Sequence, residues 1–363
     1  MQRIKNKEIP QENIPSLTAL SVAIAFSRGM HYNGYRNLFS DEEFIIIDKL
    51  IQIALSQTPN WFHWGMVKMM QKSPYPLQQS FFSKYGVSGY DQQIAGRKFM
   101  LRHKIEKAIE KSVTQVVILG GGYDTAAFHL SKKYPHVNFY ELDRSITRLI
   151  KVKALASIEN TRLSDFENDS SSTAIFNSNL RFIQCDLITD KMNQILEKNN
   201  FDAQKDTFFI AEGLTMYLTQ QQIEQILLSI HSLLKNGNEI VLGFLYSQSL
   251  ITSNVSDQIQ RSSNERYKFV LPPNQVFKFA ADSNFLLSEK ILGITLLERM
   301  GDFADAHLRQ LPNAPSEDYY TFKKAVSLEK DIEKNINEIP DMQFDIPIVP
   351  EQKITHRSGC AII

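Results

Sequence analysis

The sequence predicts an α/β fold built on a doubly wound, mostly parallel sheet. A buried-strand pattern at 116–119 runs directly into three consecutive glycines, and an amphipathic helical pattern follows at 126–134. Strand and helix patterns then alternate as far as residue 246. Such alternation favours parallel strands joined by helices, and a glycine turn between strand and helix is typical of the first crossover in these sheets.

The amino-terminal part, residues 1–111, contains helical patterns and no strand pattern. Pro59, Pro74 and Pro76 separate these helices, because proline cannot continue a helix. We therefore expect a helical cap over the sheet. Its helices are expected at 16–30, 41–57, 60–70 and 91–111.

The core is predicted to span residues 112–330, and its first five strands follow the alternation. A stretch rich in Ser, Asp and Asn at 160–179 is interpreted as a surface loop. The strands are expected at 116–119, 137–142, 180–185, 207–211 and 239–246, and the helices at 126–134, 145–158, 191–198 and 220–234.

The pattern weakens after the fifth strand. Residues 250–285 are interpreted as a polar helical insertion. Short strand patterns at 285–292 and 319–326 are expected to complete the sheet edge with an antiparallel strand. Residues 331–363 contain three prolines in a polar context, and we expect an extended tail.

Composition restricts the class of protein. The 363 residues include 40 Lys and Arg against 40 Asp and Glu, so the formal net charge is zero, and we expect no nucleic-acid partner. Two cysteines, Cys185 and Cys360, make no disulfide framework and favour a reducing, cytoplasmic location. No apolar run reaches membrane-spanning length. We predict no metal site.

The glycine turn is the first candidate binding feature. Gly120 and Gly122 fit the first two positions of a dinucleotide fingerprint, but Thr125 stands where its third glycine belongs. Glycines without Cβ atoms let a ligand approach the backbone closely. A turn with no ligand is the alternative.

Acidic residues follow three of the predicted strands. Asp143 comes 21 residues after Gly122, a spacing that suits ribose hydroxyls, although it could instead cap the next helix. Asp186 could accept a hydrogen bond from the edge of an adenine ring while Leu187 packs on its face. The alternative is that Asp186 belongs to an ordinary turn. Glu212 stands at the end of an apolar strand, at the sheet edge where ligands bind. The alternative is a solvated loop residue.

Four motifs in order, ILGGGYDT, YELD, CDL and FIAEGLTMYL, resemble the leucine carboxyl methyltransferase family and related polyketide O-methyltransferases. The resemblance covers about residues 90–326. It implies a class I, Rossmann-like methyltransferase that uses S-adenosylmethionine. It assigns Gly120 to the methionine part, Asp143 to the ribose and Asp186 with Leu187 to the adenine side. Glu212 stands at the family's acidic position near the cofactor.

The resemblance also singles out Arg97, which lies 23 residues ahead of Gly120 in a basic helix. The resemblance implies that this arginine holds the methionine carboxylate. Without the resemblance, a surface arginine would be the better interpretation. The family turn usually has another small residue where Gly121 stands and often an arginine at Ala126. We expect neither difference to abolish cofactor binding.

The implied reaction is methyl transfer to an oxygen atom of a carboxylate or hydroxyl, on a small molecule or a protein C-terminus. Tyr217 either faces this acceptor or packs in the core, and no catalytic base is assigned. The alternatives are an NAD-dependent oxidoreductase, or a membrane-recruited binding protein with a decayed methyltransferase site. The last four residues, from Cys360, match a C-a-a-X prenylation signal. Prenylation in a eukaryotic cytosol would attach the protein to a membrane; otherwise the match is accidental.

Overall fold

The fold is seen in a computed structural model that describes residues 15–29, 38–57, 90–159, 172–247, 265–293, 295–296 and 317–325. The predicted helix at 60–70, the first part of the predicted insertion and the tail with Cys360 lie outside these residues.

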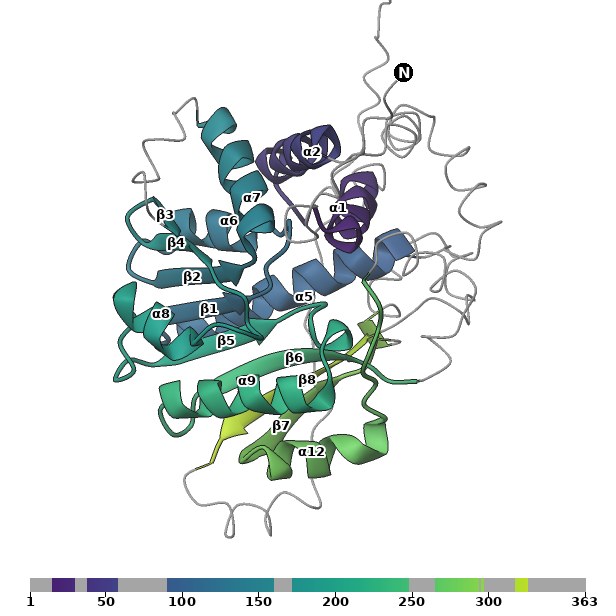
Figure 1. Cartoon of the computed structure of the whole chain (residues 1–363), viewed down its shortest axis with the longest axis vertical. Coiled ribbons are helices and arrows are strands. Elements are labelled where there is room, and N and C mark those ends of the chain that lie inside the picture. Colours follow the sequence, from purple (N-terminus) through teal and green to yellow (C-terminus); the bar gives the residue numbers. More distant parts are fainter. Residues whose placement is uncertain are drawn as a thin grey trace, which may run out of the picture.

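Within the described residues, eight strands form one sheet in the order β3-β4-β2-β1-β5-β6-β8-β7 (Figure 1). Strands β4, β2, β1, β5 and β6 are mutually parallel, whereas β3, β8 and β7 pair antiparallel. The predicted doubly wound, mostly parallel sheet is therefore confirmed. The strands are Gln115–Leu119 (β1), Asn138–Asp143 (β2), Thr173–Phe176 (β3), Leu180–Gln184 (β4), Thr207–Ala211 (β5), Glu239–Leu245 (β6), Phe285–Ile291 (β7) and Glu317–Lys324 (β8).

Helices cover both faces of the sheet. The face that carries Val116 and Ile118 packs against five helices: α1 (Leu17–Gly29), α2 (Asp41–Ser56), α5 (Tyr90–Glu110), α6 (Ala126–Lys133) and α7 (Ser145–Ile158). The face that carries Val117 and Leu119 packs against α8 (Met192–Lys198), α9 (Gln220–Leu233) and α12 (Val276–Asp282). Successive residues of a strand point to opposite faces, so one apolar run supplies both cores.

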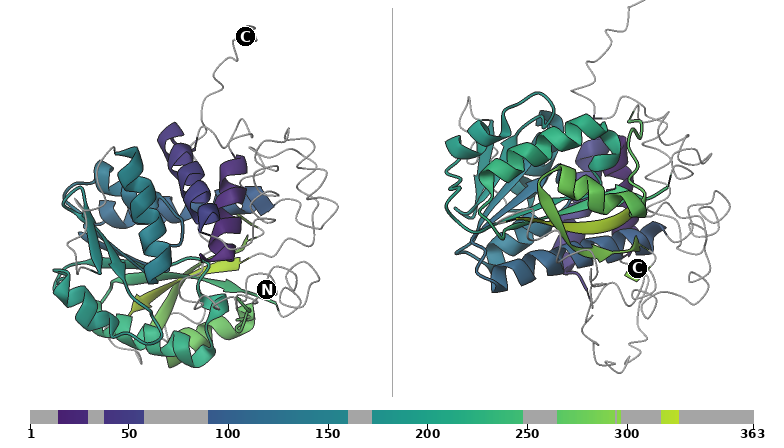
Figure 2. Two further views of the ribbon diagram at one scale, coloured as in Figure 1. Left: turned by 45° about the horizontal axis from the view of Figure 1, so that its top comes forward. Right: turned by 90° about the horizontal axis from the view of Figure 1, so that it is seen from below.

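Helices α1 and α2 lie side by side near α7 (Figure 2). Phe26 of α1 stacks on Phe44 of α2 with ring centroids 5.4 Å apart. A capping box starts α2: the Ser40 hydroxyl accepts a hydrogen bond from Glu43 N–H at 3.3 Å, and the Glu43 carboxylate accepts one from Ser40 N–H at 2.9 Å. Both helices were expected, within one residue at each end.

The prediction of a loop throughout 160–179 was wrong, because β3 lies within it. β3 pairs antiparallel with β4 through a tight turn at Asn177 and Ser178. Their φ angles are 52° and 60°. These two left-handed residues begin the three-residue loop 177–179, which reverses the chain between the strands. The polar composition that suggested a loop belongs in part to this turn.

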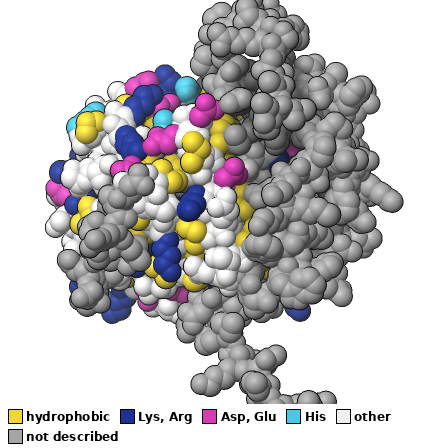
Figure 3. Space-filling view, turned by 90° about the horizontal axis from the view of Figure 1, so that it is seen from above, with side chains coloured by type: hydrophobic (Ala, Val, Ile, Leu, Met, Phe, Trp, Pro, Cys, Tyr) yellow, Lys and Arg dark blue, Asp and Glu magenta, His cyan; other side chains and the backbone are white. Residues whose placement is uncertain are grey.

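The surface seen in Figure 3 mixes basic and acidic side chains over the described residues. This arrangement agrees with the formal net charge of zero. Among the described helices, none has the length and apolar character needed to cross a membrane. The described His, Cys, Asp and Glu residues include no group of three or more that could hold a metal ion.

Candidate active site

The predicted binding residues lie along one edge of the sheet. Strands β4, β2, β1 and β5 are adjacent and parallel, so their carboxyl ends meet there. The residues that follow these four ends are Asp186, Asp143, Gly120 and Glu212 respectively, with Asp143 the last residue of its strand. Open α/β sheets bind ligands at this edge. The structure thus brings together residues that are as much as 92 positions apart in the chain.

The glycine turn is tied to Asp143. Gly120 and Gly122 adopt φ angles of +62° and +54°, which favour glycine. Gly122 N–H donates a hydrogen bond to Asp143 Oδ2 at 2.7 Å, and Arg144 N–H donates one to Oδ1 at 2.7 Å. Arg144, not Asp143, is the N-cap of α7, so the alternative role of Asp143 as a helix cap is wrong.

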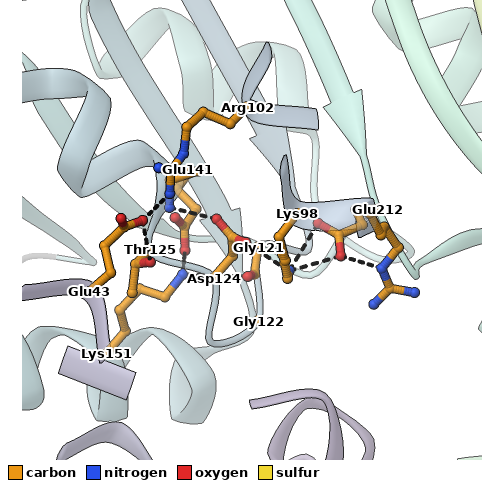
Figure 4. A network of polar contacts seen from close by, with 12 residues as sticks. Glu43, Lys98, Arg102, Gly121, Gly122, Asp124, Thr125, Glu141, Lys151 and Glu212 are labelled. Atoms are coloured by element: carbon orange, nitrogen blue, oxygen red, sulfur yellow. Dashed lines mark hydrogen bonds and ion pairs between the residues drawn. The ribbon is translucent and has the colours of Figure 1, made fainter. Parts of the chain in front are cut away.

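Lys98 of α5 joins this turn to the end of β5 (Figure 4). Its ammonium nitrogen lies 2.7 Å from Asp124 Oδ2, and 2.8 and 2.9 Å from the two carboxylate oxygens of Glu212. Asp124 also accepts a hydrogen bond from Ala126 N–H at 2.6 Å, at the start of α6. A single lysine therefore fixes the spacing between two loops at the binding edge.

Arg97, the neighbour of Lys98, bridges Glu212 and one further carboxylate, that of Glu317. Its Nε lies 2.6 Å from Glu212 Oε1, and its Nη1 donates a hydrogen bond to Glu317 Oε2 at the start of β8. The Arg97 side chain is only 11% exposed and that of Glu212 13%, so the interpretations as a surface arginine and a solvated loop glutamate are wrong. We call the five residues Arg97, Lys98, Asp124, Glu212 and Glu317 the edge cluster.

Burial and ion pairing compete in the edge cluster. Burial opposes ionisation of Asp124, but the Lys98 ammonium outweighs it and lowers the pKa of Asp124 to about 2. Burial also opposes the charge of Lys98, yet the Asp124 and Glu212 carboxylates raise the pKa of that ammonium. Both groups are therefore charged near neutral pH. At Asp143, burial raises the pKa despite the donor from Gly122.

A buried ion pair between β2 and α7 contacts the glycine turn. Glu141 of β2 and Lys151 of α7 are 3% and 2% exposed and bind each other directly. The Lys151 ammonium also donates a hydrogen bond to the Gly121 carbonyl oxygen at 3.4 Å. Burial raises the pKa of Glu141 to about 7, against the attraction of Lys151. Residues two apart in a strand share a face, so Glu141 lies on the same side of β2 as Asp143, the side that faces α7.

Asp186 and Leu187 are half-buried beyond the end of β4. Asp186 Oδ1 accepts a hydrogen bond from Ile188 N–H at 2.8 Å, which is ordinary turn chemistry. The Leu187 side chain packs against the core on the α9 side of the sheet. Tyr217 lies in a short 3₁₀ helix, Thr215–Tyr217, and its ring centroid is 5.5 Å from that of Tyr267.

The amino-terminal end of α1 lies over the glycine turn. An ideal Cβ placed on Gly122 would be 3.6 Å from Ala19 Cβ. Glu265 Oε2 accepts hydrogen bonds from the Ser16 hydroxyl and from Thr18 N–H, both at 3.1 Å. Its other oxygen lies 3.2 Å from an Arg144 guanidinium nitrogen. Glu265 thus fastens α1 to the residue that follows Asp143.

Sequence reasoning missed Lys98, Asp124, Glu265 and Glu317. Lys98 and Asp124 were close to predicted residues, and their places beside Arg97 and the glycine turn were the available signal. Glu317 lies 220 residues from Arg97, and no local pattern points from one to the other.

Known proteins resemble this chain in sequence and in fold. A family model described as leucine carboxyl methyltransferase matches residues 30–231, more than half of the chain. No curated protein matches it. A solved protein from Thermobifida fusca YX assigned as a methyltransferase is 13% identical, with 70% of this chain and 90% of that one covered and a TM-score of 0.48.

Two further solved structures resemble the chain more distantly. An O-methyltransferase family protein from Burkholderia thailandensis is 12% identical over 78% of this chain and 72% of its own, with a TM-score of 0.38. The O-methyltransferase from a trans-AT PKS multienzyme of Brevibacillus brevis, in complex with S-adenosyl-L-homocysteine, is 13% identical over 66% and 79%, with a TM-score of 0.40.

The family match covers the glycine turn, Asp143 and most of the edge cluster. It agrees with the four ordered motifs of the sequence. The chain therefore belongs to the leucine carboxyl methyltransferase family, and it is a methyltransferase.

Proposed function

We propose that the protein transfers a methyl group from S-adenosylmethionine, the cofactor of its family, to an oxygen atom. The acceptor is a carboxylate or hydroxyl of a small molecule or of a protein C-terminus. The observation that carries this proposal is the hydrogen bond between Gly122 and Asp143 directly beside the edge cluster. A ribose-binding carboxylate and a charged site for an amino acid lie together there.

The residues at the edge fit the chemical groups of S-adenosylmethionine. The methionine end is a zwitterion, and the edge cluster offers both signs of charge to it. The Arg97 guanidinium suits a carboxylate because its planar fork can make two parallel hydrogen bonds. The Asp143 carboxylate suits ribose hydroxyls, and Asp186 with Leu187 suits the adenine ring. The left-handed turn at Gly120 and Gly122 lets the cofactor approach the backbone.

Catalysis in this proposal consists mainly of positioning. When bound, S-adenosylmethionine supplies an electrophilic methyl group on a positively charged sulfur. The protein's residues hold the donor, orient the acceptor in line and exclude water, for which α1 provides a cover beside Gly122. An acceptor carboxylate is already ionised at neutral pH and needs no base, whereas a hydroxyl acceptor needs one. We assign no catalytic base, and we propose that Tyr217 faces the acceptor.

The proposal includes the predicted division of the chain. Residues 1–111 would form the cap on the acceptor side, 112–330 the cofactor-binding core and 331–363 the tail with Cys360.

Isothermal titration with S-adenosylmethionine and S-adenosylhomocysteine tests the cofactor site. We expect micromolar binding of both, and no binding of NAD. Failure of folded protein to bind either ligand would contradict the proposal, and NAD binding in their place would favour the oxidoreductase.

Transfer of a radiolabelled methyl group to panels of carboxylic acids, phenols and alcohols then tests the chemistry. Mild alkali releases labelled methanol from an ester but not from an ether. Label found only on nitrogen, sulfur or carbon would contradict O-methylation.

A further inference from the structure

The edge cluster contains more negative than positive charge. Arg97 and Lys98 supply two cations, whereas Asp124, Glu212 and Glu317 supply three carboxylates. All five side chains are at most 15% exposed. Water screens charge poorly at such depth, so one surplus negative charge exerts a strong field on any ligand held at this edge.

Glu317 is the carboxylate that makes the cluster negative. It begins β8, which runs antiparallel to β6, and it pairs with Leu245 at the carboxyl end of that strand. This register places Glu317 at the same edge as the glycine turn, although it is distant in sequence. It also lies beyond the residues that the family model matches.

The partners of Glu317 leave its charge incompletely balanced. Its Oε2 accepts hydrogen bonds from Arg97 and, at 2.9 Å, from the Tyr319 hydroxyl. Arg97 is shared with Glu212. Glu317 Oε1 is buried and has no hydrogen-bond partner among the described residues. A buried acceptor without a donor is costly, and a positive charge nearby would reduce that cost.

We propose that Glu317 determines which charge state of the cofactor the site prefers. This inference rests on the proposed function. S-adenosylmethionine carries a carboxylate, an ammonium and a sulfonium, so its net charge is +1. Transfer breaks the sulfur–methyl bond, leaves the electron pair on sulfur and joins the methyl group to the acceptor oxygen. The product S-adenosylhomocysteine has no net charge. The surplus carboxylate therefore favours the donor over the product and promotes product release.

Titration calorimetry with two unreactive ligands tests this inference without turnover. Sinefungin carries an ammonium in place of the methyl sulfonium and has a net charge of +1, whereas S-adenosylhomocysteine is neutral. Wild-type protein should bind sinefungin at least about fivefold more tightly than S-adenosylhomocysteine. Glu317→Gln keeps the shape of the side chain and should bring the ratio of the two dissociation constants close to one, a change on the scale of one partly screened charge.

Glu289→Gln is the matched control. Glu289 lies on β7, accepts a hydrogen bond from Lys104 of the same helix α5, and has no contact with the edge cluster among those described. Its substitution removes the same charge from a similar ion pair, and the ratio should stay at the wild-type value.

Three results would overturn the inference. The first is equal, tight binding of both ligands by wild-type protein, which would leave the proposed function intact. The second is an equal change in both affinities on Glu317→Gln, because a purely structural role would not alter their ratio. The third is failure of folded wild-type protein to bind either ligand, which would overturn the proposed function as well. A wild-type ratio close to one would overturn the inference even if Glu317→Gln fails to fold.

Discussion

Gly121 lies directly against the carboxyl group of Glu141. An ideal Cβ on Gly121 would be 2.5 Å from Glu141 Cδ and 2.6 Å from its Oε1. Glu141 has little freedom to move, because it is buried and bound to Lys151. The middle position of the turn is therefore a glycine because any larger residue would overlap the buried ion pair of Glu141 with Lys151.

Gly121→Ala should lower the free energy of unfolding by about 1–3 kcal/mol, because the new methyl group overlaps a fixed side chain. Urea unfolding measures the loss. In a Glu141→Ala background the same change should cost far less, since the obstructing carboxyl group is gone. An equal cost in both backgrounds would mean that the clash is not with Glu141.

The contribution of Glu141 to stability should fall as the pH rises. Burial raises the pKa of this carboxyl from 4.5 to about 7 in the folded protein. Between these values the folded state holds a proton that the unfolded state has lost, so the contribution of Glu141 to the free energy of unfolding decreases with increasing pH and levels off above about 7. Urea unfolding across this range should show that Glu141→Gln flattens the decrease. Glu197→Gln, an exposed change on α8, should leave it unaltered.

Arg97→Ala should weaken S-adenosylmethionine binding by about 1.5–3 kcal/mol, the scale of a lost charged hydrogen bond. Calorimetry measures the affinity, and thermal unfolding reports the stability lost when Glu317 loses its cation. Arg102→Ala is the control, since Arg102 lies on the same helix and pairs with buried Glu43. It should lower stability and leave the affinity of correctly folded protein unchanged. Equal loss of affinity in both variants would remove Arg97 from the binding site.

Glu265→Ala should loosen the start of α1. Its carboxylate accepts hydrogen bonds from Ser16 and Thr18, and their loss should cost about 1 kcal/mol, as for other helix caps. Hydrogen exchange of the first amides of α1 should accelerate roughly fivefold, and the exchange of α9 should not change. Arg144→Ala removes only the link to the turn, so its effect should be smaller. Unchanged exchange in Glu265→Ala would show that Glu265 does not hold α1.

The local patterns of the sequence were enough to predict the alternating core, because β1, β2, β4 and β5 are each largely buried and each precede a helix. They missed β3, whose polar turn at Asn177 and Ser178 resembles a loop. The candidate site was found where residues follow strand ends, as with Asp143 and Glu212. Glu265 and Glu317 escaped because only the folded chain brings them near the glycine turn, and pairing across 220 residues leaves no trace in local composition.

Because Arg97 pairs with Glu317, the charge of the edge cluster is complete only after β8 has been synthesised. The glycine turn, Asp143 and Glu212 leave the ribosome well before β8, so a nascent sheet holds Arg97 and Lys98 without their last carboxylate. Until β8 inserts between β6 and β7, the emerging site has a balanced charge and lacks its preference for a cationic ligand. The preference for a cationic ligand therefore depends on β8, the last strand of the sheet to be synthesised.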